Sequence, residues 1–519
     1  MAKLSLPPPV ADLVSSLRDG EAARAWLTTQ SLTQPLRMLR GLLAEVRAID
    51  ASVAEPATRL EILDILRPAV ILAEEGAAVR YSNKPLPLLD DEFSAFDNAR
   101  QLWLALAIAY LRSAPLLPPA LMLQAMHRGA VGLREALYCH YQADIEVAPE
   151  FLNLLYDLLA TAESLGIQRL PVDDPDFRHL QESSIASDVA WALLLHFSDP
   201  YRFTPAQLTV ANRALSRWAD LAGFQSERGD DRHAKVLALA RWPGAEEVSE
   251  GGPKWLEVRP IIRKIRKRVD ALKAGETPEQ LHLGRELSAA ACIRLMQELD
   301  LALRPKVDPI GDRLKQASVD LVFSHEHLYA LLSGKPLSDT ELSSQSTTMS
   351  HQRMAIFGFD NVVNRIDHAG ENRVPAEPWA VEDNWILRAA PAGSQVVSPL
   401  LVGIRPEKDG TPRLAILFGL RQTSDGWLAA HLRLLPEPAA SGIHNASGPA
   451  AMKSVQRQPV FLLPADEARG LPPSICLPAG SGAREGALMA LADSPVEHLR
   501  LSDVIERGSN FTRFAYAKT

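Results

Sequence analysis

Two different hydrophobic periodicities divide this chain of 519 residues, and no single ordinary core can accommodate both. In the first half, apolar residues recur at helical spacing, as in FDNARQLWLALAIAYLRSA around Leu102 and Leu106. After Trp379 they alternate, as in LAILFGLRQTSDGWLAAHLRLLP (414–436), where two alternating runs flank a turn that contains glycine. This change predicts an α+β multidomain protein, with an N-terminal body of antiparallel helices followed by a β module.

Helix ends can be placed from capping residues in the first part of the chain. Thr204 stands directly before a proline and predicts a helix start, and Gly166 predicts a helix end. Asp97 and Asn98 are placed to cap the helix of the FDNARQLWLAL stretch, and Thr277 is placed to cap a helix that continues to about residue 305. Short turns between such helices favour antiparallel packing, although no fixed repeat period is visible.

Composition divides the chain into four parts. Residues 1–224 are predicted as a helical domain, and the polar, glycine-rich residues 225–258 as a linker or long loop. Residues 259–304 contain a basic helix and a second helix, and 305–519 form the β module, with an irregular insertion near 335–375. The pattern leaves open whether this module is one barrel or two small sheets.

The stretch RPIIRKIRKRVDALKAG combines one apolar stripe, which includes Ile261, Ile265 and Leu272, with a dense run of Lys and Arg. Such a helix can capture an anion, which could be a phosphate, a nucleotide, a nucleic acid or an acidic partner. The alternative is a solvated amphipathic helix whose charge is offset by the acids of GAEEVSE just upstream. We prefer the alternative at this point, since charged helix faces are usually solvated.

Charge, cysteines and hydropathy exclude several classes of protein. The formal net charge of −8 argues against a general nucleic-acid binder. Cys139, Cys292 and Cys476 are too few for a disulfide framework and too far apart in the sequence for a zinc site. The longest apolar run, Leu102 to Leu111, is about half of what a membrane span requires. The N-terminus lacks the apolar core of a signal peptide, so we expect a cytoplasmic protein.

No catalytic constellation can be assembled from the sequence. The HEH stretch at 325–327 could place two histidines on one face of a strand, but a metal site requires further ligands. The glycines of AGSGAREG are not followed by the lysine of a phosphate-binding loop. Because no nucleophile, base and orienting group can be aligned, we expect neither an enzyme nor a metal site.

Several stretches together carry a family resemblance: DPYRFTPAQLTVANRALSRWAD, VDLVFSHEHLYALLSGKP, LFGLRQTSDGWLAAHLRLLPEP and PVFLLPADEARGLPPSICLPAG. With them, the chain resembles proteobacterial proteins of similar length that join a helical body to a C-terminal PilZ-like β-barrel. PilZ domains typically bind cyclic di-GMP through two arginines on the approach to the barrel. They add a strand motif of Asp or Asn, any residue, Ser, two residues and Gly. Arginine suits this ligand because it neutralises phosphates and stacks on purines.

The resemblance assigns candidate ligand-binding residues to this chain. Arg313 stands for one entry arginine, Arg304 is the weaker candidate for the other, and Asp383 or Asn384 could start the strand motif. The serine position holds a tryptophan or an isoleucine and no glycine follows at the right step, so the motif is degenerate. The stretch NASGPA at 445–450 is more similar to the strand motif, but it lies after the hairpin.

The resemblance therefore implies a non-enzymatic signalling or adaptor protein that binds, or once bound, cyclic di-GMP and contacts a protein partner. The alternative is an interaction scaffold that has lost nucleotide binding. The sequence does not indicate the partner, the pathway or the oligomeric state.

Overall fold

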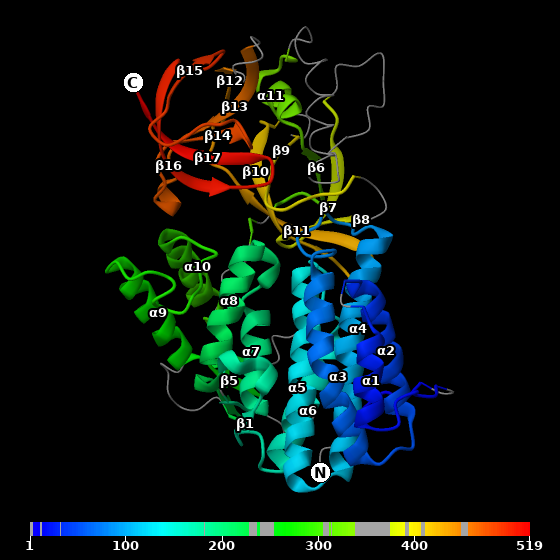
Figure 1. Cartoon of the computed structure of the whole chain (residues 1–519). Helices are drawn as coiled ribbons and strands as arrows, with labels where there is room; N and C mark the ends of the chain where they lie inside the picture. Colours follow the sequence, from blue (N-terminus) through cyan, green and yellow to red (C-terminus); the bar gives the residue numbers. More distant parts are fainter. Residues whose placement is uncertain are drawn as a thin grey trace. The chain divides into compact units, whose positions relative to one another are not determined.

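The computed structural model describes residues 4–10, 13–31, 33–180, 182–227, 236–238, 254–304, 311–312, 314–337, 374–389, 394–405, 410–447 and 455–519. The chain forms two compact units. The helical unit comprises Met1–Lys84 and Leu88–Asp308, and the barrel unit comprises Pro85–Pro87 and Pro309–Thr519 (Figure 1). Helices followed by β-barrels confirm the α+β multidomain fold.

The helical unit is built around four long helices. Its helices are α1 (Gly20–Thr29), α2 (Pro35–Ala51), α3 (Pro56–Ala78), α4 (Asp90–Ser113), α5 (Pro119–Gln142), α6 (Pro149–Ser164), α7 (Ile185–Phe197), α8 (Pro205–Trp218), α9 (Arg259–Lys273) and α10 (Ala289–Ala302). Helices α2 to α5 lie side by side, and α4 packs on α2, α3 and α5 (Figure 1). A Cβ atom at Gly132 of α5 would lie 3.0 Å from the Cβ of Ala107 in α4. Glycine therefore permits the close approach of α4 and α5.

Two of the helix ends agree with the capping analysis. The Thr204 hydroxyl accepts a hydrogen bond from the Gln207 amide at the start of α8. Gly166, with φ +68°, follows the end of α6, where positive φ costs glycine little. The predicted apolar stripe of α9 is also buried, including Ile261 and Ile265.

Two other helix starts were predicted wrongly. Asp97 and Asn98 lie inside α4, which begins at Asp90 because the Glu92 carboxylate accepts from the Leu89 amide and caps an earlier turn. The Thr277 hydroxyl accepts from the Gln280 amide as a cap would, but only a turn follows. Helix α10 begins twelve residues later, after Ser288, which provides its own side-chain cap. A cap signal thus marks a turn as readily as a helix when no apolar periodicity supports it.

The range 225–258, expected as a linker or long loop, contains part of a small antiparallel sheet. Its strands are β3 (Gly223–Gln225), β4 (Val236–Ala238) and β5 (Trp255–Glu257), in the order β3-β5-β4. Strand β5 leads directly into α9, so the pairing of β5 positions the start of the basic helix. Residues 228–235 and 239–253 lie outside the described residues.

The barrel unit contains two closed six-stranded barrels, which settles the alternative of one barrel or two sheets. The first has the order β10-β11-β8-β7-β6-β9 and the second β12-β13-β14-β17-β16-β15. The strands of the first are β6 (Ser318–Val322), β7 (Glu377–Glu382), β8 (Trp385–Ala389), β9 (Leu400–Ile404), β10 (Arg413–Gln422) and β11 (Trp427–Leu434). Those of the second are β12 (Ala440–Ser447), β13 (Val455–Leu463), β14 (Ser474–Pro478), β15 (Leu488–Ala492), β16 (His498–Arg507) and β17 (Phe511–Lys518). Helix α11 (His325–Ser333) follows β6, and most of the expected insertion, 338–373, lies outside the described residues.

A shared apolar cluster joins the two barrels. Ile416 of the first barrel and Phe461 of the second belong to one buried cluster with residues of α11. The Asn510 side chain accepts from the Leu401 amide at 2.8 Å and donates to the Leu401 carbonyl at 3.0 Å, so it continues the backbone bonding of β9. Leu417, which follows Ile416 in β10, points to the opposite face of this strand and is also buried. Both faces of the hairpin are therefore buried, although the alternating pattern in the sequence indicated only one buried face.

Within the described part of the chain, no helix has the length and apolar character needed to cross a membrane.

Candidate ligand-binding site

The three residues assigned by the resemblance fall in different places. Arg304 follows α10 in the helical unit, and its Nη2 lies 2.7 Å from Oδ2 of Asp300. Arg313 lies outside the described residues. Asp383 is exposed in the two-residue turn between β7 and β8 of the barrel unit, with φ +54°. A site that combines all three therefore stays a prediction.

Residues beside two of these positions meet on β11. The His431 Nδ1 donates to the carbonyl of Asn384, the second residue of the β7–β8 turn, at 2.9 Å. Asp312, which precedes Arg313 in the chain, donates its amide to the Leu432 carbonyl at 2.8 Å. The Asp312 carboxylate also accepts from the Leu434 amide at 2.7 Å. Strand β11 thus anchors both the entry segment and the turn that holds Asp383.

An aromatic stripe, formed by Trp385, His431 and Phe418, crosses three neighbouring strands at this level. His431 of β11 is the register partner of Trp385 on β8 and of Phe418 on β10, so all three side chains share one face. The ring centroids of His431 and Trp385 are 3.6 Å apart, and those of His431 and Phe418 are 5.5 Å apart. His431 is buried, whereas the two outer rings are partly exposed.

Two arginines flank the aromatic stripe. The guanidinium carbon of Arg421 lies 4.2 Å from the centroid of the Trp385 ring, and that of Arg433 lies 5.6 Å from the Phe418 ring. Arg433 also pairs with Glu506 of the second barrel at 2.5 Å. In such an arrangement the planar ring faces can stack on a purine, and the guanidinium groups can neutralise a phosphate.

Sequence reasoning missed this stripe for a definable reason. Trp385 was considered only as a residue that blocks the expected serine, and Phe418 only as part of an apolar strand face. A β-bulge after Phe418 also shifts the register of β10 against β11, and the sequence alone does not locate it. Counting back from the turn between β10 and β11 would pair Phe418 with Leu432, so no signal in the sequence pairs Phe418 with His431.

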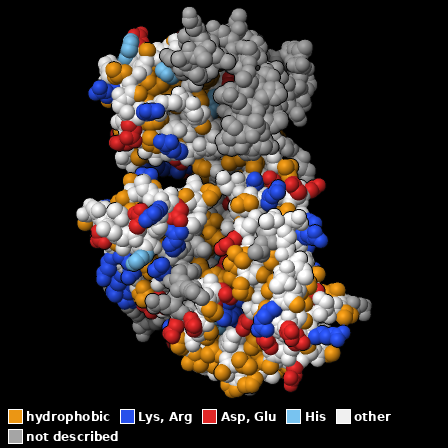
Figure 2. Space-filling view, viewed as in Figure 1, with side chains coloured by type: hydrophobic (Ala, Val, Ile, Leu, Met, Phe, Trp, Pro, Cys, Tyr) orange, Lys and Arg blue, Asp and Glu red, His pale blue; other side chains and the backbone are white. Residues whose placement is uncertain are grey.

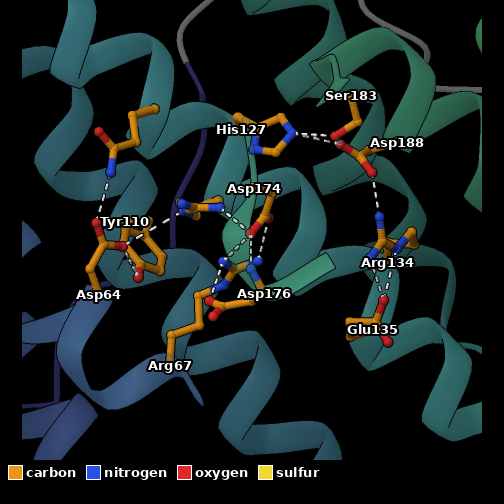
Figure 3. Close-up of polar contacts among 12 residues, drawn as sticks. Asp64, Arg67, Tyr110, His127, Arg134, Glu135, Asp174, Asp176, Ser183 and Asp188 are labelled. Atoms are coloured by element: carbon orange, nitrogen blue, oxygen red, sulfur yellow. Dashed lines mark hydrogen bonds and ion pairs between the residues drawn. The ribbon is translucent and has the colours of Figure 1, made fainter. Parts of the chain in front are cut away.

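A buried network of charged groups lies in the helical unit (Figure 3). Arg67 of α3 donates to both carboxylate oxygens of Asp174, at 2.8 and 2.7 Å, and to Asp176 at 2.7 Å. Arg128 of α5 approaches Asp174 to 2.6 Å. Burial alone would raise the pKa of Asp174, but the bonds from Arg67 and the charge of Arg128 hold that pKa well below its usual range. The two arginines thus tie the segment around residues 172–176 to the helices.

The second half of the network contains a serine, a histidine and an aspartate in contact. The Nε2 atom of His127 lies 2.6 Å from Ser183 Oγ and 3.1 Å from Asp188 Oδ2 (Figure 3). In a hydrolase relay the aspartate must bind Nδ1 while Nε2 faces the serine. Here both oxygens face the same nitrogen, and Asp188 is also paired with Arg134. The arrangement therefore fits a structural network that holds the start of α7.

The HEH stretch does not lie on a strand. His325 and His327 lie in the first turn of α11, and the His325 ring is 5.7 Å from the ring of Phe461. In the part of the chain that the structure describes, no three His, Cys, Asp or Glu side chains are grouped so that they could hold a metal ion.

Comparison with known families concerns the helical unit. Residues 21–229 match the family model described as "Cyclic-di-GMP receptor FimW, N-terminal domain". The match runs from α1 through β3. Neither the curated proteins nor the solved structures include a match to the chain. The N-terminal part of this chain is therefore similar to the N-terminal domain of a cyclic-di-GMP receptor, and two six-stranded barrels follow it in the sequence.

Proposed function

We propose that this protein is a receptor for cyclic di-GMP that acts in the cytoplasm by binding and not by catalysis. The match of residues 21–229 to a family described as a cyclic-di-GMP receptor is the observation that carries this proposal. The C-terminal barrels support it, because a PilZ-like domain is a β-barrel. Such a receptor would transmit the bound state to a protein partner.

We place the ligand at the aromatic stripe of the first barrel. The exposed part of Trp385 and the guanidinium of Arg421 offer a surface on which a guanine base can stack. Arg313 follows Asp312, whose main chain and side chain are anchored on β11, and it would supply the phosphate contact. Asp383, in the adjacent turn, would accept from the guanine edge. Arg304, the weaker candidate for a second phosphate contact, belongs to the helical unit and is bound by Asp300, so it forms no part of this placement.

Isothermal titration of the full chain with cyclic di-GMP tests this proposal. We expect binding heat for the wild type, and a loss of at least about tenfold in affinity, about 1.4 kcal/mol, for Arg421→Ala and for Arg313→Ala. Arg500→Ala is the matched control, because Arg500 is exposed on β16 of the second barrel. Absence of heat from the wild type at high micromolar protein would overturn the nucleotide proposal. Equal losses in all three variants would overturn the placement of the site.

A second candidate function is an interaction scaffold without a small ligand. The observation that favours it is the degenerate motif, in which Trp385 or Ile386 occupies the serine position. The ion pair between Arg433 and Glu506 also engages one of the arginines that flank the stripe. This candidate predicts that affinity-purified protein retains the same partners with and without cyclic di-GMP. A partner set that changes on addition of the nucleotide would exclude it.

A further inference from the structure

A basic pocket lies in the helical unit and includes residues of the basic helix α9, whose sequence left open either anion capture or a solvated charged face. It is a cavity of about 180 Å³ between α8, α9 and the turn at residues 281–283. Its polar lining comes from Arg217 and Trp218 of α8, Lys264 and Arg268 of α9, and His282 of the turn. Figure 2 shows Lys and Arg side chains gathered at the left of the helical unit, where Figure 1 places α9.

Within the part of the chain that the structure describes, the cations of the basic pocket lack ion-pair partners. Among the described residues, none forms an ion pair with Arg217, Lys264 or Arg268, and Arg268 Nε is buried there without a hydrogen-bond partner. Two acids of neighbouring segments are paired with other arginines. Glu286 binds Arg213 at 2.6 Å, and Asp300 binds Arg304 and Arg266. Among the described residues, the pocket therefore has an excess of positive charge.

Helix α9 is strongly basic, whereas the chain as a whole is acidic. Helix α9 carries seven Lys and Arg and a single Asp, although the protein has a net charge of −8. Lys264 and Arg268 are one turn apart on the same face, and such a like-charge pair costs a helix roughly 0.2–0.5 kcal/mol. An anion bound between them would remove this repulsion.

The turn at one side of the pocket holds His282 in a left-handed backbone conformation. His282 has φ +60°, a region that costs a residue with a side chain on the order of 1–3 kcal/mol. The turn is held by hydrogen bonds from the Leu283 amide to the Pro278 carbonyl at 2.8 Å and from the His282 amide to the Glu279 carbonyl at 2.9 Å. These bonds place His282 at the edge of the cavity, where its ring N–H can donate to a ligand.

The size of the cavity limits the ligand. Sites for whole drug-sized molecules occupy roughly 300–1,000 Å³, so a cavity of about 180 Å³ admits a phosphate group but not an entire dinucleotide. Guanidinium and ammonium groups around a small cavity are the donors that phosphate oxygens prefer. We propose that the basic pocket binds the phosphate group of a small phosphorylated ligand, at a second site distinct from the aromatic stripe.

Titration of the full chain at constant ionic strength tests this proposal with inorganic phosphate, pyrophosphate and GTP as probes. We expect saturable binding of at least one probe, weakened about tenfold or more by Lys264→Gln and by Arg268→Gln. Lys267→Gln is the matched control, because it removes the same charge from an exposed position of α9 outside the pocket. Circular dichroism at 222 nm checks that the variants retain their helices.

The probes and controls separate the outcomes. Binding of phosphate and pyrophosphate identifies a free phosphate site, and binding of GTP alone identifies a nucleotide phosphate site; both support the proposal. No saturable binding of any probe overturns it, and so does an equal loss in Lys267→Gln, which would mean unspecific attraction by the whole helix. The Arg421→Ala variant should bind the probes like the wild type, so failure of the cyclic di-GMP proposal leaves this result unaffected.

Discussion

Glu74 is a partly buried residue whose ionisation should set a pH dependence of the helical unit. It lies on α3, and its Oε1 accepts from the Tyr81 hydroxyl at 2.8 Å and lies 3.9 Å from the Cys139 sulfur. Burial raises the pKa of Glu74 from an ordinary value of 4.5 to about 7, although the Tyr81 hydrogen bond opposes this shift. The folded protein therefore retains this proton over a pH range in which the unfolded chain has already lost it.

The sign and size of the effect follow from proton linkage. Because the folded pKa is the higher one, the stabilisation by Glu74 is complete at low pH and is lost as the pH rises from about 4.5 to about 7. Between pH 5 and pH 8 this loss is about 2.5 kcal/mol of unfolding free energy. In Glu74→Gln the amide stays neutral, so this part of the pH dependence disappears. Any fixed cost of the new NH₂ group cancels in the comparison between the two pH values.

Urea unfolding followed at 222 nm measures this difference. The signal reports mainly on the helical unit, since the only α-helix that the structure describes in the barrel unit is the nine-residue α11. We expect Glu74→Gln to gain about 2.5 kcal/mol relative to the wild type between pH 5 and pH 8. Glu61→Gln, an exposed charge removal on the same helix, should show little of this gain. Parallel pH profiles for the wild type and Glu74→Gln would refute the reasoning.

Three further changes test other parts of the fold. Arg67→Met leaves the buried Asp174 without its main partner and should destabilise the helical unit by about 3–5 kcal/mol in urea unfolding at pH 7. Asn510→Ala removes both bonds to Leu401 and should lower the free energy of unfolding of the barrel unit by about 1–3 kcal/mol, measured by amide hydrogen exchange of the barrel strands; unchanged exchange would contradict a role in joining the barrels. Thr204→Ala removes the cap of α8 and should cost about 1 kcal/mol, whereas Thr204→Ser should restore most of it.

Local patterns in the sequence were sufficient to predict whether most elements are helices or strands. The apolar stripe of α9, the cap at Thr204, the stop at Gly166 and the β10–β11 hairpin all depend on residues within a few positions of one another. Helical and strand periodicities repeat over such short distances, so the α+β character of the chain was predictable. The two helix starts were predicted wrongly because another residue nearby also caps a turn, and that residue begins the helix.

Contacts between distant residues were decided only by the tertiary structure. Alternation shows which face of a strand is apolar but not which strand pairs with it, so the closure into two barrels could not be read from β6 and β9 or from β14 and β17. Arg67 and Asp174 are 107 positions apart, and no local pattern links them. The basic pocket likewise needs α8, α9 and a turn to meet. The sequence by itself determined which half of the chain forms helices and which forms strands, because their periodicity is local. Only the folded chain decided which charges are neutralised and which remain available to a ligand, because that depends on packing between segments far apart in the sequence.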